Sequence, residues 1–165
     1  MSSYHAPKKS LGQNFLTSIP ARMQIVSAGE ITPTDTILEI GPGKGFLTKA
    51  LLETGASIVA LEKDRDLLPL LTESFSSEIA SQQLTLTEGD VLEFEPQNHK
   101  LIANNYKLIA NIPYYITGAI LSKFLSSTYQ PSTMVVLVQK EVAERVCARD
   151  GKESLLSLSV KVYGE

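Results

Sequence analysis

Runs of apolar residues recur along the chain at intervals that suit buried strands. Four runs, at 36–40, 57–62, 108–110 and 134–139, are apolar enough to be buried, and 83–87 alternates apolar and polar residues as a strand does. Between the runs lie stretches whose apolar residues are three or four positions apart, which is helical spacing. Strands that alternate with helices predict an α/β protein with a doubly wound, mostly parallel sheet.

The helical stretches have recognisable ends. They are predicted at 19–31, 46–53, 66–75, 116–125 and from residue 140 onwards. Gly29 and Gly55 are expected to stop the first two, and Pro69 suits the third only because it falls in the first turn. Residues 93–105 are polar and predict a loop. We interpret Ile116, at the start of the fourth helix, as a core residue that packs on the sheet.

A glycine-rich loop follows the first predicted strand. A strand, a glycine loop and a helix form half of a nucleotide-binding βαβ unit, because glycines let the backbone approach a ligand and the first helical amides point at it. Gly41, Gly43 and Gly45 occupy every second position, whereas the dinucleotide fingerprint has its third glycine one place later. Glu39, just before the loop, suits a ligand with a cationic amino-acid end, such as S-adenosylmethionine. The alternative is a glycine turn that only packs the helix on the strand.

Acidic residues stand where the second and third predicted strands end. Glu62 closes the second strand, where an open α/β sheet places a carboxylate for ribose hydroxyls, and Lys63 follows it. Asp90 lies in the turn after the third strand and is expected to accept a hydrogen bond from an adenine amine, with Val91 as apolar cover. The alternative for each acid is an ordinary solvated side chain at a strand end.

The N-terminal segment carries a second group of polar candidates. Gln13 and Asn14 precede Phe15 and Leu16. The two apolar residues are expected to pin the segment to the protein while the two amides lie over a ligand. The alternative is a capped N-terminal segment without a ligand.

The fourth predicted strand ends in Asn111, Ile112, Pro113 and Tyr114. Proline fixes its own φ and restricts the preceding residue to extended conformations, so this turn is stiff. The Asn111 carboxamide and the Ile112 carbonyl are predicted to be neighbouring acceptors beside the Tyr114 ring. Two acceptors beside an aromatic face suit a nucleobase with an exocyclic amine. The alternative is a strand end with a turn proline and a half-buried tyrosine.

The composition is that of an ordinary globular domain. With 165 residues, 43% of them hydrophobic and 20% charged, we expect one domain spanning 1–165. The net charge of −3 gives no overall basic signature, so a surface for nucleic acid has to be local. Because Cys147 is the only cysteine and the chain has two histidines, we expect neither a disulfide nor a metal site. No apolar run approaches the ~20 residues of a membrane span, and we expect a cytoplasmic monomer.

Six motifs, in this order, resemble the ribosomal RNA adenine dimethyltransferases that modify small-subunit RNA, whose relatives include the erythromycin-resistance methylases. The motifs are 11–16, 38–45, 61–64, 88–91, 111–114 and 139–142, so the resemblance covers nearly the whole chain. It implies a Rossmann-like methyltransferase fold and N6,N6-dimethylation of adenines in small-subunit ribosomal RNA during ribosome assembly. It also implies that residues 155–163, whose apolar positions fit a strand and a helix equally, are helical.

The resemblance also implies which residues hold the cofactor. Those that match the family motifs are Asn14, Leu16, Gly41, Glu62, Asp90 and Asn111. Reasoning from the residues themselves adds Gln13, Glu39, Gly43, Gly45, Lys63 and Val91. The predicted catalytic group is Asn111, Ile112, Pro113 and Tyr114, and the predicted partner is small-subunit ribosomal RNA or a pre-ribosomal subunit.

The chain departs from the family pattern at its end. Family members continue past Glu165 into a closing antiparallel hairpin and a small helical domain that helps grip RNA. We therefore expect residues 1–165 to be the N-terminal part of a methyltransferase domain, better at binding the cofactor than at binding RNA.

Three other functions are alternatives to this interpretation. A DNA-adenine or glutamine methyltransferase usually has a second proline where Ile112 stands, and an NAD oxidoreductase is disfavoured by the glycine spacing. A non-catalytic RNA-binding assembly factor that keeps the cofactor pocket stays open at this point.

Overall fold

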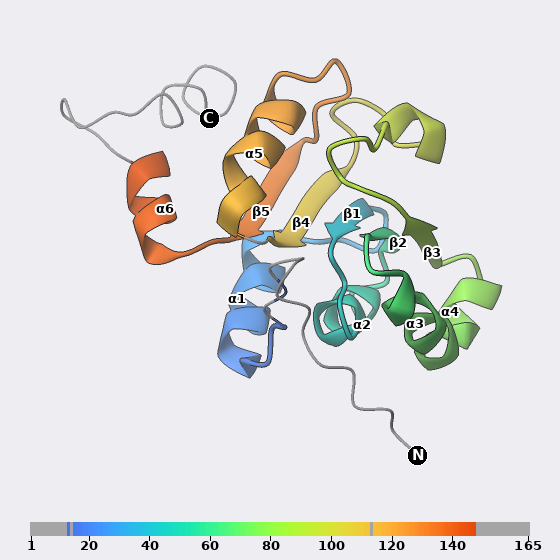
Figure 1. The fold of residues 1–165 in the computed structure, drawn as a ribbon. Helices are drawn as coiled ribbons and strands as arrows, with labels where there is room; N and C mark the ends of the chain where they lie inside the picture. The colour runs from blue at the N-terminus through green and yellow to red at the C-terminus, as the bar shows by residue number, and fades with distance from the viewer. Residues whose placement is uncertain (1–12, 14, 113, 148–165) are drawn as a thin grey trace.

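A computed structural model describes the chain except for residues 1–12, 14, 113 and 148–165, and it contains one five-stranded parallel sheet with helices on both faces (Figure 1). The strands are β1 (Thr36–Ile40), β2 (Ser57–Glu62), β3 (Leu84–Glu88), β4 (Lys107–Asn111) and β5 (Thr133–Leu137). All four strand pairs are parallel. The doubly wound α/β architecture predicted from the sequence is therefore confirmed.

The strand order β3-β2-β1-β4-β5 creates a switch point between β1 and β4. From β1 the chain winds outwards through β2 and β3, and it then returns to lay β4 on the other side of β1. Ile40 at the end of β1 is in register with Leu61 and with Ala110, so three strands finish at one level. In open α/β sheets the crevice outside such a point is where ligands bind.

Two hydrophobic cores form because successive side chains of a strand point to opposite faces. One core, which we call the α2 core, joins Ile37 and Ile109 to helices α1 (Ile19–Ala28), α2 (Phe46–Leu52) and α3 (Leu68–Ser74). The other, the α5 core, joins Leu38 and Leu108 to α5 (Thr117–Leu125) through Ile120 and Phe124. In Figure 1 the first group of helices lies below the sheet and α5 above it.

Several predicted boundaries need correction. The predicted helix 66–75 is divided into a 3₁₀ turn, Arg65–Leu67, and α3, with α4 (Ser76–Ala80) after it. Pro69 lies in the first turn of α3, as expected. Helix α1 ends at Ala28 with Gly29 as its C-cap, and the left-handed residue that follows is Glu30, with φ of 43°.

The predicted loop 93–105 is more ordered than its polar composition indicated. It contains a 3₁₀ turn, Pro96–His99, and it buries Phe94 and Leu101 in the α5 core. The few apolar residues of this segment show no period, so they were too weak a signal for this burial. Helix α6 (Lys140–Val146) follows β5 as predicted, and the prediction for 155–163 lies outside the described residues.

Within the described residues, no helix has the length and apolarity that a membrane crossing requires. The same part of the chain holds no group of three His, Cys, Asp or Glu side chains arranged to bind a metal ion.

Candidate active site

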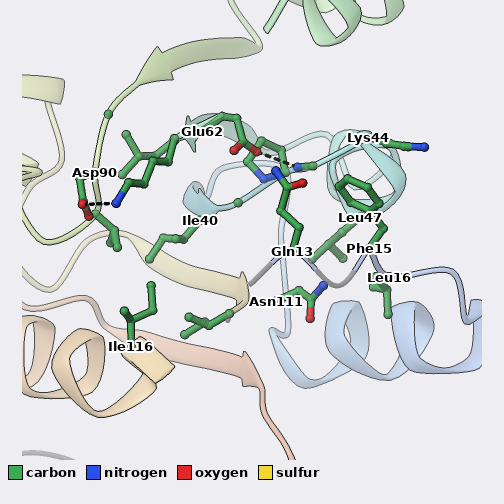
Figure 2. A pocket seen from close by; sticks show the side chains of 18 of the residues that line it. Gln13, Phe15, Leu16, Ile40, Lys44, Leu47, Glu62, Asp90, Asn111 and Ile116 are labelled. Atoms are coloured by element: carbon green, nitrogen blue, oxygen red, sulfur yellow. Dashed lines mark hydrogen bonds and ion pairs between the residues drawn. The ribbon is translucent and has the colours of Figure 1, made fainter. Parts of the chain in front are cut away.

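A cavity of about 270 Å³ opens where β1, β2 and β4 end, at the switch point of the sheet (Figure 2). Five other segments complete its wall, namely the N-terminal segment, the glycine loop, the start of α2, the turn after β3, and the 3₁₀ turn after β4. Nine of the predicted cofactor residues line it: Gln13, Leu16, Gly41, Gly43, Glu62, Lys63, Asp90, Val91 and Asn111. Residues separated by up to about a hundred positions therefore meet on one surface.

The glycine loop is held to the end of β2 by its own backbone. The Gly41 amide donates to the Leu61 carbonyl at 2.9 Å, and the Gly43 amide donates to the Glu62 carboxylate at 3.0 Å. A second amide, that of Asp64, donates to the other Glu62 oxygen at 2.8 Å. Glu62 is thus oriented before any ligand arrives. Burial raises the pKa of the Glu62 carboxyl, and the hydrogen bonds from the Asp64 and Gly43 amides offset part of that rise.

The N-terminal segment is fastened at two points. Gln13 donates to Asp64 at 2.7 Å, which ties the segment to the end of β2. Phe15 and Leu16 pack against the α2 core, as predicted, and both also line the cavity. Asn14 lies outside the described residues, so its predicted role stays a prediction.

Asp90 is engaged on both oxygens. Lys63 Nζ lies 2.6 Å from one of them, and the Leu92 amide donates to the other at 3.0 Å. The hydrogen bond from Lys63 and that from the Leu92 amide hold the pKa of Asp90 below its ordinary value. Asp90 is therefore an ionised acceptor on the cavity wall, with the buried Val91 beside it.

The end of β4 faces the glycine loop across the cavity wall. A Cβ added to Gly41 would lie 3.9 Å from the Asn111 carbonyl oxygen, so the two motifs are in contact range. Asn111 and the buried Ile112 line the cavity. The predicted site for a reactive amine and the predicted cradle for a cofactor thus share one space.

The turn after β4 differs in part from the prediction. Pro113 and the side chain of Tyr114 lie outside what the structure describes, although the Tyr114 backbone belongs to the 3₁₀ turn Tyr114–Ile116. Ile116, interpreted from sequence as core only, packs on the α5 core and also lines the cavity. Tyr115 lines the cavity as well and is 65% exposed. The adjacent pair Tyr114 and Tyr115 was the feature of the sequence that could have indicated this role for Tyr115.

Two predicted cofactor residues do not line the cavity. Gly45 faces the core, where its missing side chain makes room for the Phe75 ring. Glu39 is 1% exposed and lies on the face of β1 that packs against α2, whereas the next residue, Ile40, lines the cavity. The level along the strand explains the difference. Glu62 and Asn111 share the face of Glu39 but lie two residues nearer the strand ends, where the cavity opens.

The sequence profile of the family described as ribosomal RNA adenine dimethylase matches residues 4–165. The chain belongs to that family. All six sequence motifs lie in the matched range, so the resemblance that they carry is confirmed.

Similar proteins agree with the assignment to the family. A ribosomal RNA small subunit methyltransferase A from Dehalococcoides mccartyi is 42% identical over 95% of this chain and 53% of its own length. A dimethyladenosine transferase from Plasmodium falciparum matches with a TM-score of 0.77 and 28% identity, over 90% of this chain and 52% of the other. The 23S rRNA methyltransferase ErmE matches with a TM-score of 0.68 and 27% identity, over 80% of this chain and 50% of the other. The chain spans about half the length of the curated relatives it matches.

Proposed function

We propose that this protein transfers methyl groups from S-adenosylmethionine to N6 of adenines in small-subunit ribosomal RNA, giving N6,N6-dimethyladenine during ribosome assembly in the cytoplasm. The observation that supports it best is the shared cavity of the glycine loop and the end of β4. Membership of the ribosomal RNA adenine dimethylase family supports adenine dimethylation as the reaction. The similarity to the small-subunit methyltransferase from Dehalococcoides mccartyi supports small-subunit RNA as the substrate. We expect the protein to work as a monomer and without a metal.

The residues present fit the cofactor. Glu62, with both oxygens fixed by amides, is placed to accept from ribose hydroxyls. Asp90, ionised and on the same wall, is placed to accept from an adenine amine. Gly41 and Gly43 leave the wall free of side chains where the backbone approaches the ligand. When bound, S-adenosylmethionine supplies a methyl group on a sulfonium that is already activated.

The end of β4 is proposed to hold the target amine. The exocyclic nitrogen of adenine is a poor nucleophile because its lone pair is delocalised into the ring. The Asn111 carboxamide oxygen and the Ile112 carbonyl accept its two hydrogens and hold it in a near-attack geometry. The base has to leave its helix for this, and Tyr114 is proposed to stack on it. Water takes the proton of the methylated amine, so no strong base is required.

The direct test is labelled methyl transfer to small-subunit RNA that lacks the modification. A version extended to the length of the curated relatives is expected to form N6,N6-dimethyladenine, identified by nucleoside chromatography. The 165-residue chain is expected to bind the cofactor by calorimetry with less transfer. If the extended protein binds the cofactor but methylates no adenine, the proposed activity fails and the non-catalytic assembly factor becomes the better interpretation.

Asp90→Asn is expected to weaken cofactor binding by about 10- to 100-fold, because a hydrogen bond to a charged acceptor contributes roughly 1.5–3 kcal/mol. The wild-type protein should prefer the adenine cofactor to its hypoxanthine analogue, which has an oxygen in place of the amine, and the variant should lose that preference. Calorimetry with both compounds measures the two effects.

Glu93→Gln is the matched control, since Glu93 is an exposed acid in the same turn that does not line the cavity. A variant Asp90→Asn that weakens binding but keeps the full preference for adenine would show that Asp90 does not recognise the amine.

A further inference from the structure

Glu39 is a buried acid that the binding scheme above does not use. Neither of its carboxylate oxygens has a hydrogen-bond partner among the described residues, and the hydroxyl of the fully buried Thr48 on α2 has none there either. A buried polar group without a partner is costly, and a buried charge costs far more. Such a group at the base of a binding loop calls for a functional reason.

The strand register places Glu39 directly beneath the rim of the cavity. It pairs with Ala60 on β2 and with Ile109 on β4. Two residues further along those strands, on the same face of the sheet, come Glu62 and Asn111, which both line the cavity. Glu39 is therefore one layer below two cavity residues, close to the cavity without lining it.

The surroundings of Glu39 disfavour its charged form. Glu62 faces it from β2 and repels it, while α2 and β4 contribute the neutral Thr48 and Asn111. The cation on α1, Arg22, donates to the Phe46 carbonyl at 3.4 Å and lies over the Phe46 ring, and its Nε is buried without a partner among the described residues.

Burial raises the pKa of the Glu39 carboxyl to about 8, and the nearby Thr48 hydroxyl offsets part of the rise although it makes no hydrogen bond of normal geometry. The negative charge of Glu62 raises it further.

We propose that Glu39 is a positioning residue for a cationic ligand: it is a neutral acid in the free protein and gives up its proton when a positive charge occupies the cavity beside Glu62. The inference rests on the proposed function, which supplies the cation as the ammonium and sulfonium of S-adenosylmethionine. The proton passes to the buffer, and the carboxylate left behind attracts the ligand through the loop. An acid that is destabilising in the free protein becomes favourable in the complex.

Calorimetry in two buffers of different ionisation enthalpy measures the proton release. At pH 7 to 8 the wild-type chain is expected to release a fraction of a proton on binding S-adenosylmethionine, and less with S-adenosylhomocysteine, which lacks the sulfonium. Its affinity should rise with pH up to about 8, by at most tenfold per unit. Glu39→Gln should release fewer protons and show a flatter pH profile. Glu53→Gln, an exposed acid just after α2, is the matched control.

A second measurement needs no cofactor. Folding raises the pKa of Glu39 from its ordinary value of 4.5. The free energy of unfolding is therefore highest below pH 4.5, where the carboxyl is protonated in both states, and it falls as the pH rises towards 8. Glu39→Gln does not titrate there. Its unfolding equilibrium constant, measured in urea at a series of pH values, should become smaller than that of the wild type by up to about tenfold per pH unit in this window.

These outcomes separate the proposal from its rivals. Equal proton release by Glu39→Gln and the wild type would assign the proton to another group and overturn it. Binding lost at every pH in Glu39→Gln, with no proton release in the wild type, would make Glu39 an ionised ligand and also overturn it. If the wild type binds no S-adenosylmethionine at any pH, the proposed function fails, while the unfolding series still decides whether Glu39 is neutral.

Discussion

Replacing Asn111 by alanine is expected to reduce methyl transfer by at least about 100-fold while weakening cofactor binding by less than about tenfold. The carboxamide lies on the cavity wall at the end of β4, where it is proposed to hold the amine. A misplaced nucleophile costs about 100-fold or more in rate, whereas one lost neutral hydrogen bond costs roughly 0.5–1.5 kcal/mol of binding. Single-turnover transfer by the extended protein and calorimetry on the same sample give the two numbers.

Two further variants sharpen this prediction. Asn111→Asp keeps an acceptor oxygen and should retain more turnover than Asn111→Ala. Asn98→Ala removes an exposed carboxamide from the 3₁₀ turn Pro96–His99, away from the cavity wall, and should change neither number. Equal losses of binding and turnover in Asn111→Ala would reject the proposed role of the carboxamide in holding the amine.

Gly45→Ala is expected to destabilise the fold by about 2–5 kcal/mol. Gly45 caps α2 with φ of +80°, a region that costs other residues roughly 1–2 kcal/mol. A Cβ there would also lie 2.4 Å from the Phe75 ring, which is buried in the α2 core, and such overpacking costs about 1–3 kcal/mol. Urea unfolding followed by circular dichroism measures the loss.

Gly118→Ala is the matched control, because an added Cβ in this α5 position meets nothing within 4 Å. It should stabilise the helix by up to about 1 kcal/mol. Combining Gly45→Ala with Phe75→Leu should cost less than the sum of the two single changes, since the smaller side chain relieves the collision. Additive losses would show that the backbone conformation alone requires glycine at position 45.

The outcomes for Gly45 and Glu39 show where sequence reasoning reaches its limit. Both belong to the motif that identified the site, and both were expected to meet the cofactor. The structure turns Gly45 towards Phe75, which is 30 residues later in the chain, and Glu39 towards α2. A motif specifies the residue types that a loop needs, but it does not say which of them meet the ligand and which meet the core.

Local sequence patterns also failed to indicate some residues and contacts at the cavity. Ile116 has the spacing of a core helix residue and fills that role, yet it also borders the cavity because the 3₁₀ turn precedes α5. Lys63 and Asp90 are 27 positions apart in the sequence, and their ion pair joins the end of β2 to the turn after β3. No local pattern distinguishes such a pair from two solvated charges.

The sequence by itself determined the alternation of strands and helices, the glycine loop, and the polar residues that follow each strand. These features depend on local periodicity and on the preferences of glycine and proline, which act within a few residues. Only the tertiary structure decided which side chains share the cavity, which acid is buried beneath it, and how the end of β4 meets the glycine loop. Those relations arise from strand order and register, which bring distant segments together and assign each side chain to one face of the sheet.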